Sequence, residues 1–109
     1  MAWLLKDGQV LATLEIADGF DARLRGLLGR DGIEGALLLR PARSVHTFGM
    51  RFPIDVAYCD RELRVLDVAR MGRHRMARPR LRAHCVIEAE AGAFERWDLR
   101  PGDELEIKG

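Results

Sequence analysis

Alternation of hydrophobic and polar positions predicts a series of short β-strands along this chain. An apolar run at 2–6 and an alternating run at 9–16 are separated by Asp7-Gly8, a pair typical of tight hairpin turns. Further strands are expected where short apolar or alternating runs lie between turn residues, at 36–39, 53–59, 63–68, 85–89 and 104–108. The pattern therefore predicts a mainly β protein that opens with a hairpin.

Helical spacing occurs in two places. An amphipathic helix is expected over 19–29, where apolar residues recur three or four positions apart, with Asp18 able to cap its first turn and Gly29 ending it. A short second helix is expected at 93–97, near the C-terminus. The core is expected to contain Leu14, Leu24, Leu28, Leu38, Ile54, Val56, Val65, Val86, Phe94 and Trp97, with Arg23, Arg61 and Arg64 exposed.

Length and composition indicate one globular domain, residues 1–109. Apolar residues make up 48% of the chain and charged residues 32%, a balance that permits a folded core. The 18 basic and 17 acidic residues nearly cancel, so no overall charge draws the molecule to nucleic acid or anionic lipid. The first apolar run is too short for a signal peptide, and no run approaches the length of a membrane helix. We therefore expect a soluble cytoplasmic protein that is a monomer or weak dimer.

The first candidate site is the 44–55 loop. Its candidate ligand-binding residues are His46, Thr47, Met50 and Asp55. A carboxylate and an imidazole can act as general base and orienting group, but no nucleophile accompanies them at a recognisable spacing. Asp55 can instead accept hydrogen bonds from the backbone amides of the 44–52 loop. Both interpretations of Asp55, structural and functional, stay open on the sequence.

The second candidate site is a long loop expected at 69–83. It holds Arg70, Arg73, Arg75, Arg78, Arg80 and Arg82, and the acidic residues nearest to it are Asp67 and Glu88. Guanidinium groups suit phosphate and carboxylate, so the candidates for anion binding are Arg73, Arg75 and Arg78. The alternative is that the acidic C-terminal residues neutralise this loop. Because the loop has no aromatic side chain for base stacking, we expect nucleic-acid binding to be weak and non-specific at most.

The metal-ligand candidates are His46, His74, His84, Cys59 and Cys85. Their spacing contains no C-x-x-C or H-x-x-x-H pair, and the neighbours His84 and Cys85 point to opposite faces of a strand. We expect no metal and no other cofactor. Cys59 and Cys85 can be neighbours across strands, and in the cytoplasm they are expected to be free thiols.

Several stretches of the chain resemble one known family. The sequence Ser44-Val45-His46-Thr47-Phe48-Gly49-Met50-Arg51-Phe52-Pro53-Ile54-Asp55-Val56 is similar to the central signature of the prokaryotic domain of unknown function 192. Other motifs of that family resemble, in the same order, Arg25-Gly26-Leu27-Leu28-Gly29-Arg30, Val86-Ile87-Glu88, Ala91-Gly92 and Leu99-Arg100-Pro101-Gly102-Asp103. The resemblance covers about 20–107. Many members have Trp-Met-Lys-Asn at positions 46–49 and glycine in place of Asp98, so roles of those residues do not transfer.

The resemblance implies a compact, largely antiparallel β fold with short helices, and it implies no reaction. The expected fold class is α+β, mainly antiparallel β, with a barrel-like or sandwich-like sheet, one amphipathic helix near the N-terminus and one short helix near the C-terminus. The preferred function is an accessory module that binds a small ligand or a protein through the 44–55 loop. The alternatives are an enzyme of undefined reaction that uses Asp55 and His46, and a weak anion or nucleic-acid binder that uses the 70–82 arginines.

Overall fold

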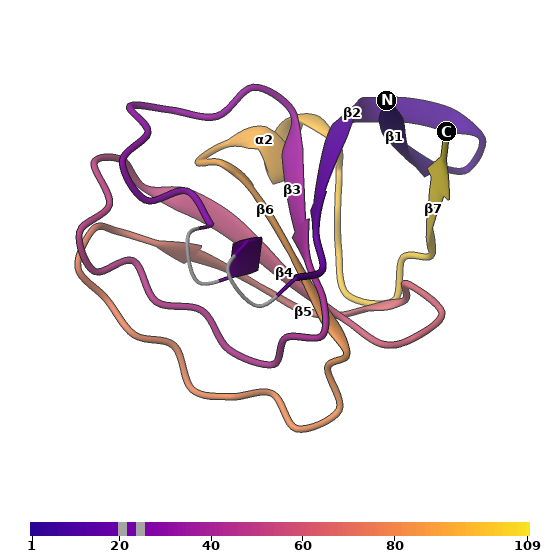
Figure 1. The fold of residues 1–109 in the computed structure, drawn as a ribbon. Coiled ribbons are helices and arrows are strands. Elements are labelled where there is room, and N and C mark those ends of the chain that lie inside the picture. Colours follow the sequence, from indigo (N-terminus) through magenta and orange to yellow (C-terminus); the bar gives the residue numbers. More distant parts are fainter. Residues whose placement is uncertain (20–21, 24–25) are drawn as a thin grey trace.

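The computed structural model describes residues 1–19, 22–23 and 26–109, which form one curled sheet of seven strands (Figure 1). The strands are β1 (Ala2–Lys6), β2 (Gln9–Ala17), β3 (Ala36–Leu39), β4 (Ile54–Cys59), β5 (Val65–Met71), β6 (Cys85–Glu90) and β7 (Leu105–Lys108). A short helix, α2 (Ala93–Arg96), follows β6. The order across the sheet is β5-β4-β6-β3-β2-β1-β7. The expected mainly β architecture and the short C-terminal helix are confirmed.

Strand pairing in the described sheet is antiparallel except between β2 and β3. The opening hairpin has the expected tight turn, since Asp7 and Gly8 both adopt positive φ, at 52° and 77°. β2 and β3 run parallel, with Leu14 opposite Ala36. A parallel pair needs a long connection, and the segment 18–35 provides it.

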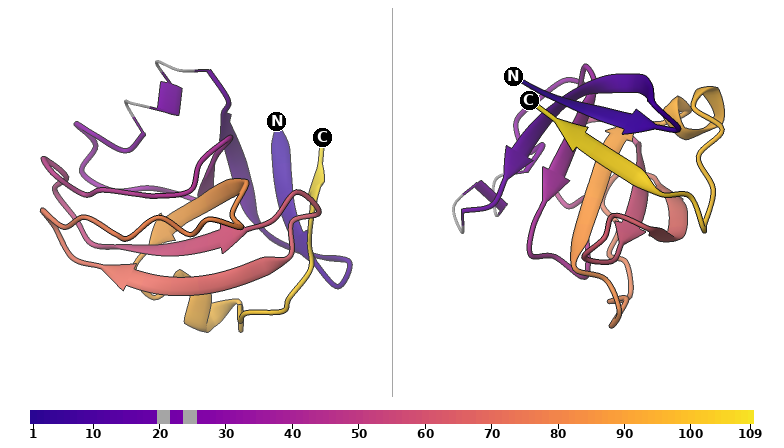
Figure 2. Two further views of the ribbon diagram at one scale, coloured as in Figure 1. Left: turned by 90° about the horizontal axis from the view of Figure 1, so that it is seen from below. Right: turned by 90° about the vertical axis from the view of Figure 1, so that its right-hand side faces the viewer.

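The sheet curls so that the starts of its two edge strands, β5 and β7, come together (Figure 2). At the start of β5, the N–H of Val65 donates to the carbonyl of Asp103 at 2.8 Å. At the start of β7, the N–H of Leu105 donates to the carbonyl of Leu63 at 3.0 Å. The result is a half-barrel, and because β1 pairs antiparallel with β7, the N- and C-termini lie side by side.

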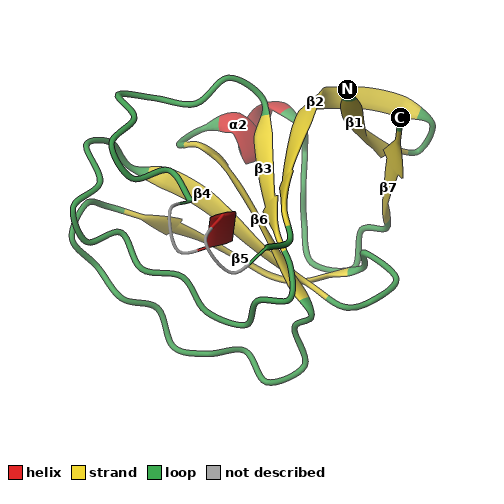
Figure 3. Ribbon diagram, viewed as in Figure 1, coloured by secondary structure: helices red, strands yellow, loops and turns green. Residues whose placement is uncertain are grey.

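Two hydrophobic clusters pack against opposite faces of the sheet, because side chains alternate along each strand. One cluster fills the inside of the curl and includes Leu38, Ile87 and Phe94 of α2. The other lies on the outer face, beneath the loops at 40–53 and 72–84 that are drawn green in Figure 3. β4 is therefore buried along its whole length.

The amphipathic helix expected over 19–29 is not seen. Positions 20–21 and 24–25 of that span lie outside the described residues, and of the remainder only two residues are helical. Gly26 has a φ of 48°, a left-handed conformation that ends a helix, and 26–29 form turns. Gly26 therefore interrupts the helix that the spacing of apolar residues predicts. In the described part of the chain, no helix is long and apolar enough to cross a membrane.

The expected core is confirmed at most positions. The residues buried as expected are Leu14, Leu38, Ile54, Val56, Val65, Val86 and Phe94. The prediction is wrong for Leu28, which is 37% exposed because it lies in the turn, and Trp97 is only half-buried. Leu24 lies outside the described residues. Two of the three arginines expected at the surface are exposed, whereas Arg23 is half-buried.

Candidate functional site

One carboxyl group is buried on the outer face of the sheet. Glu88 lies in β6, with Leu37 and Val56 beside it on the neighbouring strands, and only 3% of the residue is exposed. Removal from water disfavours the charged form and raises the pKa of Glu88 to about 7. Within the described residues, this carboxyl group forms no hydrogen bond or ion pair. Burying a charge without a partner is costly, and none of the described residues offsets that cost for an ionised Glu88.

A cavity of about 80 Å³ lies directly over Glu88. Its walls come from segments far apart in the sequence: the turn at 26–28, the loop at 44–50 and the strands β3 and β6. The backbone at Gly26 approaches closely, since a Cβ there would lie 3.9 Å from Glu88 Oε1. Apolar wall residues include Leu27, Val45 and Met50. Three of the stretches that resemble family motifs thus meet around a single carboxyl group.

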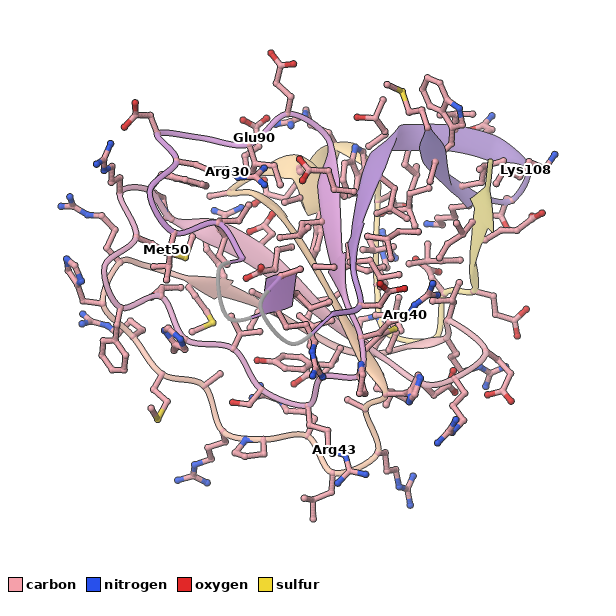
Figure 4. All side chains as sticks on the ribbon, in the orientation of Figure 1. Arg30, Arg40, Arg43, Met50, Glu90 and Lys108 are labelled. Carbon is pink, nitrogen blue, oxygen red and sulfur yellow. The ribbon has the colours of Figure 1, made fainter. Side chains whose placement is uncertain are left out.

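A wider groove of about 460 Å³ adjoins this cavity. The cavity and the groove share four lining residues, namely Arg23, Leu39, Ser44 and His46. The guanidinium of Arg23 donates to the carbonyl of Pro41 at 2.8 Å, and its buried Nε has no hydrogen-bond partner among the described residues. Arg43 also lines the groove and lies at the outer edge of the loops in Figure 4. A small cavity beside a broader, largely apolar groove that also carries a few polar side chains is a common form of ligand site.

Asp55 faces the opposite side of the sheet from Glu88. It is 3% exposed, and its carboxylate accepts hydrogen bonds from the N–H groups of Gly92 at 2.9 Å and Phe94 at 3.1 Å. Arg70 Nε donates a third hydrogen bond at 3.0 Å. Asp55 therefore holds the start of α2 against the sheet, and its amide donors follow β6 rather than coming from the 44–52 loop.

His46 and Asp55 do not share a site. Asp55 lines a cleft of about 370 Å³ together with Arg70 and Glu95. His46 instead lines the cavity over Glu88. Because the sheet separates the cleft from the cavity, these two side chains are not placed to act together as base and orienting group.

Thr47 links two loops rather than lining the cavity. It is fully buried, and its hydroxyl donates to the carbonyl of Gly72 at 2.6 Å and accepts from the N–H of Arg75 at 2.8 Å. The N–H of Thr47 also donates to the carbonyl of Arg75 at 2.8 Å. These bonds fasten the 44–50 loop to the 72–77 segment, so Thr47 determines where the cavity wall lies.

The arginines at 70–82 fall into two groups. Arg70 forms ion pairs with Asp55 and Glu95, and Arg80 forms one with Asp67 at 3.0 Å. The exposed members without an ion pair in the described part of the chain are Arg73, Arg75, Arg78 and Arg82. Of the arginines at 70–82, only Arg70 pairs with an acidic C-terminal residue among the described residues.

The two cysteines lie opposite each other on β4 and β6, and both are buried free thiols. The hydrogen bond between them and their burial raise the pKa of Cys59 well above its usual range, so this sulfur stays protonated. Among residues that the structure describes, no three histidine, cysteine, aspartate or glutamate side chains converge as metal ligands.

Two features of the site were not among the predicted site residues, Glu88 and Phe48. The signal for Glu88 is present in the sequence, because it is the one charge inside the apolar strand 85–89. Phe48 gave no such signal. It is 47% exposed and stacks on His46, with ring centroids 5.6 Å apart.

The fold and the site together define a class of protein: a mainly antiparallel β module with a curled sheet and a small cavity over a buried carboxyl group. The chain belongs to the DUF192 family, described as Uncharacterized ACR, whose family model matches residues 2–107. The resemblance of the sequence motifs to this family is confirmed.

Relatives of similar sequence occur in archaea. A UPF0127 protein of Thermococcus gammatolerans is 34% identical over 96 residues, which cover 83% of this chain and 63% of that protein. A UPF0127 protein of Pyrococcus horikoshii is 31% identical over 97 residues, which cover 84% of each chain. The chain spans only 61% to 64% of the length of the three Thermococcus relatives that it matches.

Solved structures share the fold. A proposed transcription regulator from Sinorhizobium meliloti aligns with a TM-score of 0.80 and 22% identity, covering 97% of this chain and 91% of that one. A protein of unknown function from Novosphingobium aromaticivorans aligns with a TM-score of 0.73 and 19% identity, covering 96% and 82%. At these identities the likeness establishes the fold alone.

Proposed function

We propose that this protein is a binding module for a small molecule whose cationic or hydrogen-bond-donating head group contacts Glu88, beneath the 44–50 loop. The observation that carries the proposal is the buried carboxyl group itself, whose pKa is raised to about 7 by burial. Because the described chain provides this group with no partner, a ligand that donates hydrogen bonds would offset the cost of burying its charge.

The size and chemistry of the cavity support a particular ligand class. A volume of about 80 Å³ suits a few non-hydrogen atoms, such as an ammonium group on a short alkyl stem. The apolar walls formed by Val45 and Met50 would pack against the stem. Ser44, His46 and Arg43 line the wider groove and would contact a more polar remainder. A small amine fits this arrangement.

A binding role is better supported than catalysis. An enzyme that uses Asp55 and His46 would need both side chains at one substrate, and they line separate cavities. The cytoplasm stays our proposed location, because two buried free thiols suit a reducing compartment.

The test uses three probes of matched size: n-butylammonium, butyrate and n-butanol. Each is titrated at about pH 8, where Glu88 is ionised, into isotope-labelled protein observed by NMR. We expect millimolar binding of butylammonium, since so few atoms contribute at most about 1.5 kcal/mol each. The backbone amides of Gly26 and Met50 should shift. At about pH 5 the affinity should fall by about 100-fold, because the amine must displace a proton from Glu88.

Two variants separate this site from general charge effects. Glu88→Gln should remove the preference for butylammonium over butyrate, because the amide carries no charge. Glu106→Gln, at an exposed position of β7, should leave the titration unchanged. Equal binding of butyrate and butylammonium, or unaltered binding in Glu88→Gln, would refute the proposed function.

A further inference from the structure

Positive charge is concentrated on the two loops that cover the outer face of the sheet. Positions 35–54 and 68–87 contain no acidic residue, whereas they contain nine arginines. The arginines that are exposed and form no ion pair within the described residues are Arg43, Arg73, Arg75, Arg78 and Arg82. We call the surface formed by 43–51 and 72–82 the arginine face. It is strongly cationic although the whole chain carries a net charge of +1.

The backbone holds the arginine face in one arrangement. The N–H of Ala77 donates to the carbonyl of Val45 at 3.0 Å. The N–H of Arg80 donates to the carbonyl of Arg43 at 2.8 Å. With the bonds of Thr47, these contacts join the two loops over much of their length. Binding there would order side chains but not the backbone, which keeps the entropy cost of association low.

An exposed aromatic pair lies within the arginine face. Phe48 is 47% exposed and stacks on His46 with an angle of 26° between the rings. The N–H of Gly49 donates to His74 Nδ1 at 3.2 Å, so Phe48 lies beside the segment that carries Arg73 and Arg75. The loop at 69–83 itself has no aromatic side chain on which a base could stack. The neighbouring loop supplies one.

A groove of about 570 Å³ follows the same loop and is lined by Arg70, Arg75, Arg78 and Arg80. We infer that the arginine face binds single-stranded nucleic acid, with phosphates in contact with the arginines and a base stacked on Phe48. Single strands are bound by this combination of a cationic groove and an aromatic platform, because an unpaired base leaves its face open.

Other polyanions fit the arginine face less well. Duplex recognition commonly places a helix in the major groove, and α2, with four residues, lies on the opposite side of the sheet. An acidic peptide would pair with the arginines but would not need the exposed ring of Phe48. The aromatic residue therefore distinguishes a nucleic-acid partner from an acidic protein.

The experiment measures fluorescence anisotropy of a labelled strand of about 15 thymidines, a length matched to known binding sites. A duplex of the same length and an oligoglutamate peptide serve as competing probes. We expect a dissociation constant of order 10⁻⁶ M at about 50 mM NaCl. Four phosphate contacts predict that affinity falls by about 50-fold when salt rises fourfold. The duplex and the peptide should bind more weakly than the strand.

Matched variants locate the binding surface. Combined glutamine substitutions at Arg73, Arg75 and Arg78 should weaken binding of the strand at least about tenfold and flatten its salt dependence. The control carries the same change in net charge at exposed arginines elsewhere, Arg61, Arg64 and Arg100. It should change affinity less than about twofold. Phe48→Ala should weaken binding of the strand about fivefold or more, without affecting the peptide.

Each other outcome overturns the inference. Absence of saturable binding to the strand would refute the inference directly. If the two triple variants lose the same affinity for the strand, binding depends on net charge and not on the arginine face. If the peptide binds as tightly as the strand and Phe48→Ala has no effect, the partner is an acidic protein. Melting of the two triple arginine variants and of Phe48→Ala should match the parent protein, because the substituted side chains are exposed. Glu88→Gln should leave strand binding unchanged, which separates this surface from the cavity.

Discussion

Replacing the buried carboxyl group of Glu88 with the neutral amide of glutamine should stabilise the protein at about pH 8 and have little effect at about pH 5. The pKa of Glu88 is about 7 in the folded protein, against an ordinary value of 4.5. Each tenfold difference in proton affinity is worth about 1.4 kcal/mol, so folding the ionised form costs about 3 kcal/mol more than folding the protonated form. Glutamine keeps the shape of the protonated form and avoids that cost.

The sign of the pH dependence follows from proton binding. A pKa that is raised on folding means that the folded state binds the proton more tightly between pH 4.5 and about 7. The stability contributed by this group is therefore fully present below pH 4.5 and is lost as the pH rises through about 7. Glu15 acts in the opposite direction, because its hydrogen bond with Arg30 lowers its pKa. Only the difference between the parent protein and the variant isolates Glu88.

The measurement is urea unfolding of the parent protein and Glu88→Gln at about pH 5 and about pH 8. At the higher pH, the free energy of unfolding of the variant should exceed that of the parent by about 2–3 kcal/mol. At the lower pH, the two should agree within about 1 kcal/mol. Glu106→Gln, at an exposed position, should show the same small difference at both values. A Glu88→Gln difference that does not change with pH would show that this carboxyl group is not buried as described.

Three further substitutions test the fold by chemical denaturation. Asp55→Asn should lower the free energy of unfolding by about 1–3 kcal/mol, because the amide cannot accept all three hydrogen bonds; no loss would mean that the start of α2 is held otherwise. Gly35→Ala should cost about 1–3 kcal/mol, since its φ is 75° and a Cβ would collide with β2, whereas Gly32→Ala, with open space around it, should cost less than about 1 kcal/mol. Leu38→Ala should cost about 2–5 kcal/mol, and equal stability of this variant and the exposed Leu81→Ala would show that the core is misplaced.

Most strands were predictable because they are determined by local chemistry, although β5 extends to Met71, into the span that was expected to be a loop from 69 onward. The run at 36–39 is short, wholly apolar and followed by Arg40-Pro41, and it forms β3 over the expected residues. The hairpin between β1 and β2 depends on Asp7-Gly8, which adopt the φ values that such turns require. Patterns of this kind need no information from distant parts of the chain.

The site was not predictable, because contacts between distant parts of the chain bring its residues together. The pairing of the 44–50 loop with the 72–77 segment depends on Thr47 and on backbone bonds between positions far apart in sequence. Such contacts leave no periodic pattern in the sequence. Closeness along the chain therefore suggested one site for His46 and Asp55, although the sheet separates them. Glu88 was visible as a charge in an apolar strand, but only the fold shows which loops enclose it. In the described part of 19–29, the positive φ of Gly26 and the turn at 26–29 interrupt the predicted helix.

The antiparallel pairing of β1 with β7 has a topological consequence. Because Trp3 lies opposite Lys108, a short linker could join the existing ends and make the backbone continuous. The exposed turn at Arg61 and Glu62 could then be opened without removing any strand pair or either loop over the outer face. Such a circular permutant should keep the cavity and the arginine face intact. For the same geometric reason, this module could be inserted into a surface loop of another protein with little distortion of its host.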